Sequence, residues 1–255
     1  MKAKKSYGQH FLNNEGIAER IASSFAHTHA RVLEVGPGQG MLTKHLLAQN
    51  YALKVVEADR DMVEYLQKFY PQLSPDIIEG DFLQLPLDAV FDQQPFGLIG
   101  NFPYNISSQI VFKMLDYNQL IPEMVGMFQR EMAERIVAAP GSKTYGVISV
   151  LTQAYYEGQL LFNVSKGNFN PPPKVESAVI RLLRKENQDL GCDERLFRQI
   201  VKTTFGQRRK MLRNTLKSFF PDAAVFEAPF FRRRPEELSV SEYIELTRQV
   251  TEATK

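Results

Sequence analysis

The sequence predicts an α/β fold with a mainly parallel sheet, followed by a small all-α domain at the C-terminal end. Through the first two-thirds of the 255 residues, short apolar runs alternate with stretches of helical periodicity, which is the rhythm of βαβ units. Beyond a polar stretch at 184–189, only helical periods follow. We therefore expect one domain over residues 1–184 and a helical domain over residues 185–255.

The expected strands are short continuous apolar runs. Such runs fit strands that are covered on both faces, because a strand with one solvent face would alternate apolar and polar residues. The runs lie at 31–35, 53–57, 77–79, 97–100 and 123–128. Helices are expected over 41–49, 61–70 and 130–138.

The C-terminal domain is expected to contain helices over 196–204, 208–220 and 239–250. Ser239, followed three residues later by Glu242, is a capping-box pattern that supports the start of the last one. If 208–220 is helical, Arg209, Arg213 and Lys217 share one side at i, i+4 and i+8, opposite an apolar side. This predicts an amphipathic helix with a cationic outer stripe.

The composition, 44% hydrophobic and 24% charged, is that of an ordinary globular protein. A single cysteine, Cys192, cannot form an internal disulfide, so we expect a protein of a reducing compartment, the cytoplasm. No apolar run approaches the roughly 20 residues of a membrane span, and no membrane association is expected. The four histidines have no cysteine partners at zinc spacing, so no metal site is expected.

Basic residues concentrate in one region of a chain whose net charge is only +2. No acidic residue interrupts the span 195–221, which favours a surface for binding a polyanion over an ordinary solvated face. The eight basic residues there are Arg195, Arg198, Lys202, Arg208, Arg209, Lys210, Arg213 and Lys217, of which the last five are the candidate RNA contacts. Residues 232–234 form a second candidate patch, and Lys2, Lys4 and Lys5 a candidate basic arm.

A glycine-rich turn follows the first expected strand, with Gly36 and Gly38 at G-x-G-x-G spacing and Glu34 just before it. Glycines permit a tight turn and close approach of a ligand, and this spacing favours a nucleoside without a pyrophosphate over a dinucleotide. Glu57 ends the second strand and can accept hydrogen bonds from ribose hydroxyls, while Asp81 after the third can accept one from an adenine amino group. A purely structural turn is the alternative.

Asn101, Pro103 and Tyr104 follow the fourth expected strand. These residues suit methyl transfer to an adenine. The adenine amine is a poor nucleophile because its lone pair is delocalised into the ring, and groups that accept its hydrogens turn that lone pair out of conjugation. The Asn101 side chain and a backbone carbonyl left free beside Pro103 are suitable acceptors. Tyr104 offers a face on which a base can stack. A polar turn before a helix is the alternative.

Together these segments resemble the ribosomal RNA adenine dimethylase family, most closely its branch that acts on the small subunit. The matching segments are 8–12, 34–38, Glu57, Asp81, 101–104, 169–177 and 205–210. The resemblance runs from Gly8 to about Glu245 and implies a Rossmann-like class I methyltransferase fold. The sequence departs from the family pattern at two positions: it has Phe102 where leucine is usual and His10 where asparagine is common.

The resemblance also implies roles for individual residues, with S-adenosylmethionine as the cofactor. The implied cofactor contacts are Gln9, His10, Leu12, Gly36, Gly38, Glu57, Asp81 and Asn101. Asn101 and the Pro103 carbonyl would grip the target amine, and Tyr104 and Phe169 would sandwich an extruded adenine. Without the family, Phe169 would be expected only to pack against the rigid turn of the three prolines that follow Asn170.

The implied activity is dimethylation of N6 in two adjacent adenosines of the 3′-terminal hairpin of small-subunit ribosomal RNA, by a monomer acting on precursor subunits. A resistance-type methylase of large-subunit RNA is one alternative, and an RNA-binding assembly factor with vestigial activity is another. A protein-glutamine methylase has a turn like 101–104, but segment 9–12 and the basic C-terminal region disfavour it.

Overall fold

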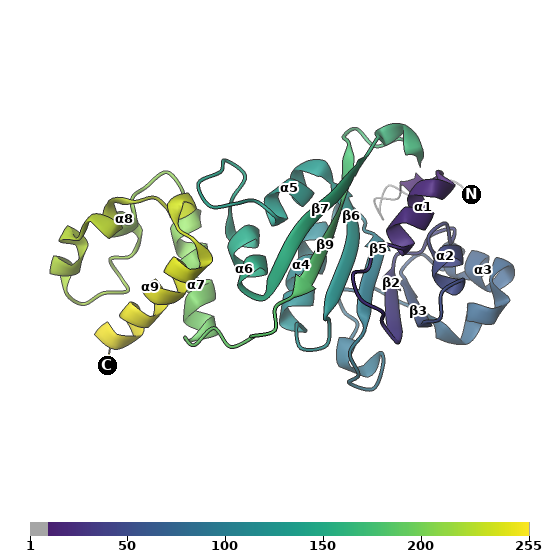
Figure 1. Ribbon diagram of the computed structural model, residues 1–255, viewed down its shortest axis with the longest axis horizontal. Helices are drawn as coiled ribbons and strands as arrows, with labels where there is room; N and C mark the ends of the chain where they lie inside the picture. The colour runs from purple at the N-terminus through teal and green to yellow at the C-terminus, as the bar shows by residue number, and fades with distance from the viewer. Residues whose placement is uncertain (1–9, 255) are drawn as a thin grey trace. The chain divides into compact units, whose positions relative to one another are not determined.

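The computed structural model describes residues 10–254, which form two compact units (Figure 1). Unit 1 comprises the chain up to Ala133 together with Glu157–Arg184, and unit 2 comprises Glu134–Tyr156 and the chain from Lys185 onward. One change of unit falls between Arg184 and Lys185, where the sequence suggests a boundary. The inclusion of Glu134–Tyr156 in unit 2 is not expected from the sequence, because its helix α6 (Val147–Tyr155) packs on helices that come much later in the chain.

Unit 1 is built on a seven-stranded sheet in the order β4-β3-β2-β5-β6-β9-β7. The five expected strands are its parallel part: β2 (Arg31–Val35), β3 (Ala52–Glu57), β4 (Ile77–Glu79), β5 (Gly97–Asn101) and β6 (Glu123–Gln129). Two further strands, β7 (Tyr156–Val164) and β9 (Ser177–Arg184), are not expected from the sequence, and β9 lies antiparallel to β6. The mainly parallel α/β fold is thus confirmed.

The core of unit 1 explains why the strands read as continuous apolar runs. Neighbouring residues such as Val32 and Leu33 point to opposite faces of the sheet, and both are fully buried. One face packs against apolar side chains of α1 (Glu15–Ala22) and α3 (Arg60–Phe69), including Ile21 and Leu66. The remaining helices that begin in this unit are α2 (Thr43–Leu47), α4 (Ser107–Asp116) and α5 (Arg130–Ile136), with short 3-10 turns at Pro71–Asp76, Leu87–Ala89 and Lys166–Asn168.

A second, two-stranded sheet joins the N-terminal segment to a late segment of unit 1. In it, β1 (Phe11–Leu12) pairs antiparallel with β8 (Phe169–Asn170). The pairing continues one residue further, where the N–H of Asn13 donates to the carbonyl of Asn168 over 2.9 Å. This small sheet brings the two segments that flank it, at His10 and Pro171, within reach of each other.

Unit 2 is helical, as expected for the C-terminal region. Besides α6 it contains α7 (Glu194–Gly206), α8 (Leu212–Thr215), α9 (Val240–Ala253) and 3-10 turns at Ala223–Glu227, Pro229–Arg232 and Pro235–Glu237. The capping box is confirmed: the Ser239 hydroxyl accepts the N–H of Glu242 at 3.2 Å, and the Glu242 carboxylate accepts the N–H of Ser239 at 2.8 Å. No helix within residues 10–254 is long and apolar enough to cross a membrane.

The expectation of one continuous helix over 208–220 is wrong. Helix α7 ends at Gly206, a turn closes with the N–H of Lys210 donating to the Gln207 carbonyl at 2.8 Å, and α8 is only four residues long. Tertiary bonds override the helical period, since the N–H of Leu212 donates to the Arg233 carbonyl at 2.9 Å. Consequently, Arg209 lies in the turn, Arg213 lies in α8, and Lys217 follows α8. These three residues do not form a stripe on one helix.

Candidate functional site

A cavity of about 640 Å³ opens at the carboxyl ends of the parallel strands of unit 1. It lies at the point where the strand order reverses between β2 and β5, which is where ligands bind in sheets of this type. Nine of the residues expected at the site line it: His10, Leu12, Gly36, Gly38, Glu57, Asp81, Asn101, Pro103 and Tyr104. Gln9, also expected there, lies outside the described residues.

The glycine turn forms the floor of this cavity with its backbone. Gly36 and Gly38 have φ angles of 68° and 55°, in the left-handed region that favours glycine. A Cβ atom added at Gly38 would lie 3.0 Å from the ring of Phe11, which itself lines the cavity. Phe11 is not among the residues expected at the site, although it stands between His10 and Leu12, which are.

Glu57, at the end of β3, braces the glycine turn. Its Oε2 accepts the N–H of Gly38 at 3.0 Å, and its Oε1 accepts the N–H of Asp59 at 2.9 Å. Burial raises the pKa of Glu57, and the two backbone donors act in the opposite direction. Each carboxylate oxygen keeps a second lone pair, so the side chain can also accept hydrogen bonds from a ligand hydroxyl.

Asp81 and Glu34 are two further carboxyl groups on the wall of the cavity. Asp81 is exposed, and its Oδ1 accepts the N–H of Leu83 at 2.9 Å, which fixes the side chain at the end of β4. Glu34 is 1% exposed and accepts a hydrogen bond from the Thr43 hydroxyl at 2.7 Å. Burial raises the pKa of Glu34 to about 8, with a smaller contribution from the charge of Glu57, so Glu34 is mainly neutral at pH 7.

Asn101 ends β5 and is tied to the N-terminal segment. Its Nδ2 donates to the backbone carbonyl of His10 at 3.1 Å, an arrangement that leaves Oδ1 as the acceptor end of the amide. The expectation of an unbonded carbonyl at Pro103 is wrong, because that oxygen accepts the N–H of Ile106 at 3.2 Å in the turn before α4. One lone pair of the Pro103 carbonyl remains for a further donor.

Tyr104 is held in place from two sides. Its hydroxyl shares a hydrogen bond of 2.5 Å with the Ser177 hydroxyl, and its ring stacks on His10 with a centroid distance of 5.5 Å and an interplanar angle of 27°. Burial raises the pKa of Tyr104. The structure does not bring Phe169 into this group. Phe169 is 3% exposed, pairs with Leu12 in the small sheet and belongs to the core, so His10 rather than Phe169 is the ring beside Tyr104.

Two tyrosines of the cavity wall, Tyr65 and Tyr70, are absent from the sequence analysis. The Tyr70 hydroxyl donates to the Gly40 carbonyl at 3.2 Å, and a Cβ atom at Gly40 would lie 2.5 Å from the Tyr70 ring. Tyr70 therefore packs directly against the glycine turn. Nothing in the sequence marks these residues, because their position depends on how α3 packs on the sheet.

The basic residues of unit 2 differ in their surroundings. The side chains of Arg209, Lys210, Arg213 and Lys217 are exposed. In contrast, Arg208 is half-buried, donates to the Ser142 carbonyl at 3.2 Å and lies 3.8 Å from the Glu236 carboxylate. Of the five candidate RNA contacts, Arg208 thus has a structural role within unit 2, and the other four are open to a partner.

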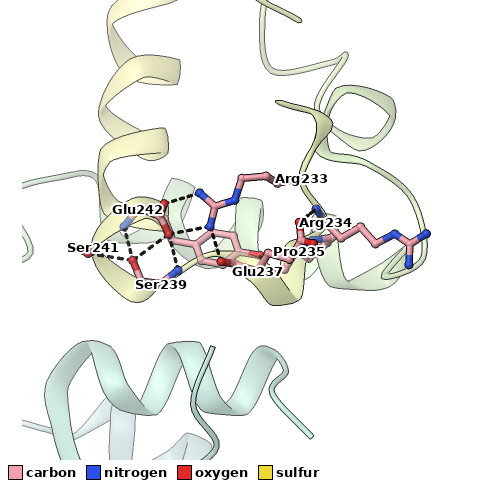
Figure 2. Close-up of polar contacts among 8 residues, drawn as sticks. Arg233, Arg234, Pro235, Glu237, Ser239, Ser241 and Glu242 are labelled. Atoms are coloured by element: carbon pink, nitrogen blue, oxygen red, sulfur yellow. Dashed lines mark hydrogen bonds and ion pairs between the residues drawn. The ribbon is translucent and has the colours of Figure 1, made fainter. Parts of the chain in front are cut away.

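The second basic patch, 232–234, is organised around one ion pair, as Figure 2 shows. Arg233 pairs with the Glu242 carboxylate and donates to the Glu237 carbonyl. The Arg233 guanidinium holds the pKa of Glu242 at about 2. In the same view the side chain of Arg234 extends away from this network. Its backbone N–H donates to the Glu237 carboxylate at 2.7 Å, and its carbonyl accepts the N–H of Glu237 at 3.1 Å.

Within residues 10–254, no three or more histidine, cysteine, aspartate or glutamate side chains are grouped so that they could hold a metal ion. The cavity in unit 1 instead offers a combination suited to an organic ligand: glycine backbone, buried carboxyl groups and aromatic walls.

Solved structures share this fold. The crystal structure of a dimethyladenosine transferase from Plasmodium falciparum matches with a TM-score of 0.81 and 25% identity, covering 96% of this chain and 98% of that one. The 23S rRNA methyltransferase ErmE matches with a TM-score of 0.69 and 24% identity, covering 94% of this chain and all of the other, which shows a common fold. The Rossmann-like methyltransferase fold expected from the sequence is confirmed.

Sequence relatives match over nearly the full length. A protein of Bacteroides thetaiotaomicron named ribosomal RNA small subunit methyltransferase A is 54% identical, covering 100% of this chain and 96% of its own. A protein of the same name from Flavobacterium johnsoniae is 51% identical, covering 98% of this chain and 96% of its own. The family model of ribosomal RNA adenine dimethylases matches residues 1–240. The chain therefore belongs to the ribosomal RNA adenine dimethylase family.

Proposed function

We propose that this chain transfers methyl groups from S-adenosylmethionine to N6 of adenines in small-subunit ribosomal RNA, forming N6,N6-dimethyladenosine at two adjacent positions of the 3′-terminal hairpin. The observation that carries the proposal is the oriented amide of Asn101, fixed by the His10 carbonyl, in the same cavity as the nucleoside-binding carboxylates. The name shared by relatives about half identical to this chain favours the small subunit as the target.

The residues of the cavity fit this cofactor. Gly36 and Gly38 present backbone without Cβ atoms for the methionine moiety, Glu57 accepts from the ribose hydroxyls, and Asp81 accepts from the adenine amino group. A cavity of about 640 Å³ is of a size that buries a ligand of this kind. S-adenosylmethionine supplies a methyl carbon made electrophilic by its sulfonium.

The target amine is activated by acceptors rather than by a titrating base. Asn101 Oδ1 and the remaining lone pair of the Pro103 carbonyl would accept the two hydrogens of the unmodified amine, which frees the nitrogen lone pair to attack the methyl carbon as its bond to sulfur breaks and the neutral thioether leaves. The methylated nitrogen then loses a proton to water. Tyr104 provides the stacking face, fixed by Ser177 on one side and by His10 on another.

Unit 1 binds the cofactor and the target base, and the exposed cations of unit 2 bind RNA phosphates in this proposal. Four exposed residues, Arg209, Lys210, Arg213 and Lys217, supply positive charge without a paired acid in their own segment. Phosphate contacts of this kind position a structured RNA by its shape, while only the extruded adenine is examined in detail.

A large-subunit methylase remains the second candidate, since ErmE has the same fold. The names of the sequence relatives favour the small subunit over it. An assembly factor without activity is disfavoured by the intact arrangement of Glu57 and Asn101. Action on precursor subunits, by a monomer located in the cytoplasm, completes the proposal.

The test is methyl transfer from radiolabelled S-adenosylmethionine to purified small and large ribosomal subunits that lack the modification. Label in the small subunit alone is the expected result. Label in the large subunit would replace the proposal with the second candidate. Binding of the cofactor without label in either subunit would favour the assembly factor.

A further inference from the structure

Residues 171–177 form a loop whose two ends are hydrogen-bonded to residues that line the cavity in unit 1. At its start, the Nδ1–H of His10 donates to the Pro171 carbonyl at 2.9 Å. At its end, the Ser177 hydroxyl shares the 2.5 Å hydrogen bond with the Tyr104 hydroxyl. Since His10 and Tyr104 both line the cavity, the loop is bonded directly to the wall on which the target base would stack.

Glu176, the residue just before Ser177, is fixed as well. The carbonyl of Glu176 accepts the N–H of Arg130 at 2.9 Å, and the Glu176 carboxylate accepts the N–H of Lys166 at 2.9 Å. On the other side, three consecutive prolines begin the loop and restrict its backbone. An exposed side chain between these anchors is therefore carried on a backbone that is restricted on both sides.

That side chain is Val175. Among residues 10–254, only two large hydrophobic residues are exposed: Phe69, at 55%, and Val175, at 45%. A single exposed apolar residue is common on protein surfaces and needs no explanation by itself. Val175 differs because it lies two residues before Ser177, in a loop that four hydrogen bonds anchor, and next to the exposed cation Lys174.

We propose that Val175 is an RNA contact that packs against the base next to the extruded adenine. Extruding a base leaves the faces of its neighbours unstacked, and apolar side chains that cover such faces stabilise the extruded state. Lys174 is placed to meet a phosphate of the same strand. The proposal rests on the function proposed above, because it assigns Val175 to the RNA substrate of the same site.

The test compares Val175→Ala with Val175→Ile and with Phe69→Ala, which removes the other exposed apolar side chain. Each protein is assayed for methyl transfer to unmodified small subunits and for binding of S-adenosylmethionine alone. A hairpin RNA carrying 2-aminopurine at the target position reports extrusion by its fluorescence. We expect Val175→Ala to lower both kcat/KM and the fluorescence signal about tenfold, with cofactor affinity and Tm unchanged. Val175→Ile and Phe69→Ala should both resemble the wild-type protein.

Equal activity and equal fluorescence in Val175→Ala and wild type would overturn the inference. An equal loss of activity in Phe69→Ala would also overturn it. So would a loss of activity in Val175→Ala that is accompanied by weaker cofactor binding. Failure of the proposed function is distinguishable from these results, because the wild-type protein would then transfer no methyl groups to small subunits.

Discussion

The side-chain amide of Asn101 donates to the backbone carbonyl of His10 over 3.1 Å. This bond joins the end of β5 to the segment just before β1, which lies 91 residues earlier in the chain. It also decides which way the amide faces, because a flipped amide would place its oxygen against the His10 carbonyl oxygen. In the proposed reaction, the acceptor for the adenine amine is therefore oriented by the fold before any ligand binds.

We expect Asn101→Ala to lower kcat by roughly 10²–10³-fold, the usual effect of removing one oriented polar group that stabilises a transition state. Cofactor affinity should change little, since Glu57 and Asp81 remain. Single-turnover methyl transfer and calorimetric titration with S-adenosylmethionine measure the two effects separately. Wild-type turnover in Asn101→Ala would remove this side chain from the chemistry.

His10 should act on the target side of the site, because its ring stacks on Tyr104 and bonds the Pro171 carbonyl. Losing a hydrogen bond worth about 1 kcal/mol should raise KM for the RNA about fivefold in His10→Ala. His10→Asn introduces the side chain common in the family and keeps an N–H donor, so it should recover part of the loss. Steady-state kinetics with small subunits provide the measurement. Equal KM values in wild type, His10→Ala and His10→Asn would show that the contacts of the His10 ring do not contribute to RNA binding.

The packing of Phe102 gives a prediction about stability. Its ring is 1% exposed, and a Cβ atom added at Gly126 would lie 2.2 Å from ring atom Cε2. Gly126→Ala should therefore cost roughly 1–3 kcal/mol of unfolding free energy through overpacking. Phe102→Leu, which introduces the residue usual in the family, should relieve part of that cost, since Phe128 Cε2 would still lie 2.8 Å from the added Cβ atom. Urea unfolding of Gly126→Ala, of Phe102→Leu and of the variant with both changes tests this prediction. If the losses in unfolding free energy were additive, the prediction would be contradicted.

Glu34 should make stability depend on pH. Its pKa is raised from 4.5 to about 8, so the folded state holds this proton more tightly than the unfolded state does. The resulting stabilisation is complete below pH about 4.5 and is lost as pH rises through about 8, a change of at most roughly 5 kcal/mol. Glu34→Gln should flatten this decline. Urea unfolding at several pH values between 5 and 8 measures this. If the free energy of unfolding fell equally steeply with pH in both proteins, Glu34 would not be the group responsible.

The cations of unit 2 should separate into RNA-binding and structural ones. We expect the double variant Arg209→Ala and Arg213→Ala to weaken RNA binding and to reduce the slope of log K against log salt by about two, with Tm unchanged. Arg233→Ala should instead lower stability by about 1 kcal/mol, a modest value because the pair with Glu242 is about one-third exposed. Filter binding across a salt series and thermal unfolding provide the data. An unchanged salt slope in the double variant would remove these residues from the RNA surface.

The cofactor side of the site could be predicted from the sequence because it depends on strand ends. In a parallel sheet the carboxyl ends of successive strands meet at one edge, so Gly36, Glu57, Asp81 and Asn101 had to gather once the strands were identified. The same reasoning could not place Tyr70, whose contact with Gly40 depends on the packing of α3.

The target side and the basic surface were harder to predict. Phe169 follows the family motif, yet its pairing with Leu12 in the small sheet buries it, and periodicity does not reveal a two-residue strand. The apolar period through 208–220 suits a helix, but the bond between the Leu212 N–H and the Arg233 carbonyl joins segments about twenty residues apart. Tertiary contacts of this kind leave no local signal.

The most direct test of the central claim is mass spectrometry of nucleosides released from small-subunit RNA after reaction with the wild-type protein and S-adenosylmethionine. The account predicts two N6,N6-dimethyladenosines per RNA, both in the 3′-terminal hairpin, and their formation at least about a hundredfold more slowly with Asn101→Ala. Methylation at any other atom or nucleoside, or undiminished product with Asn101→Ala, would contradict it.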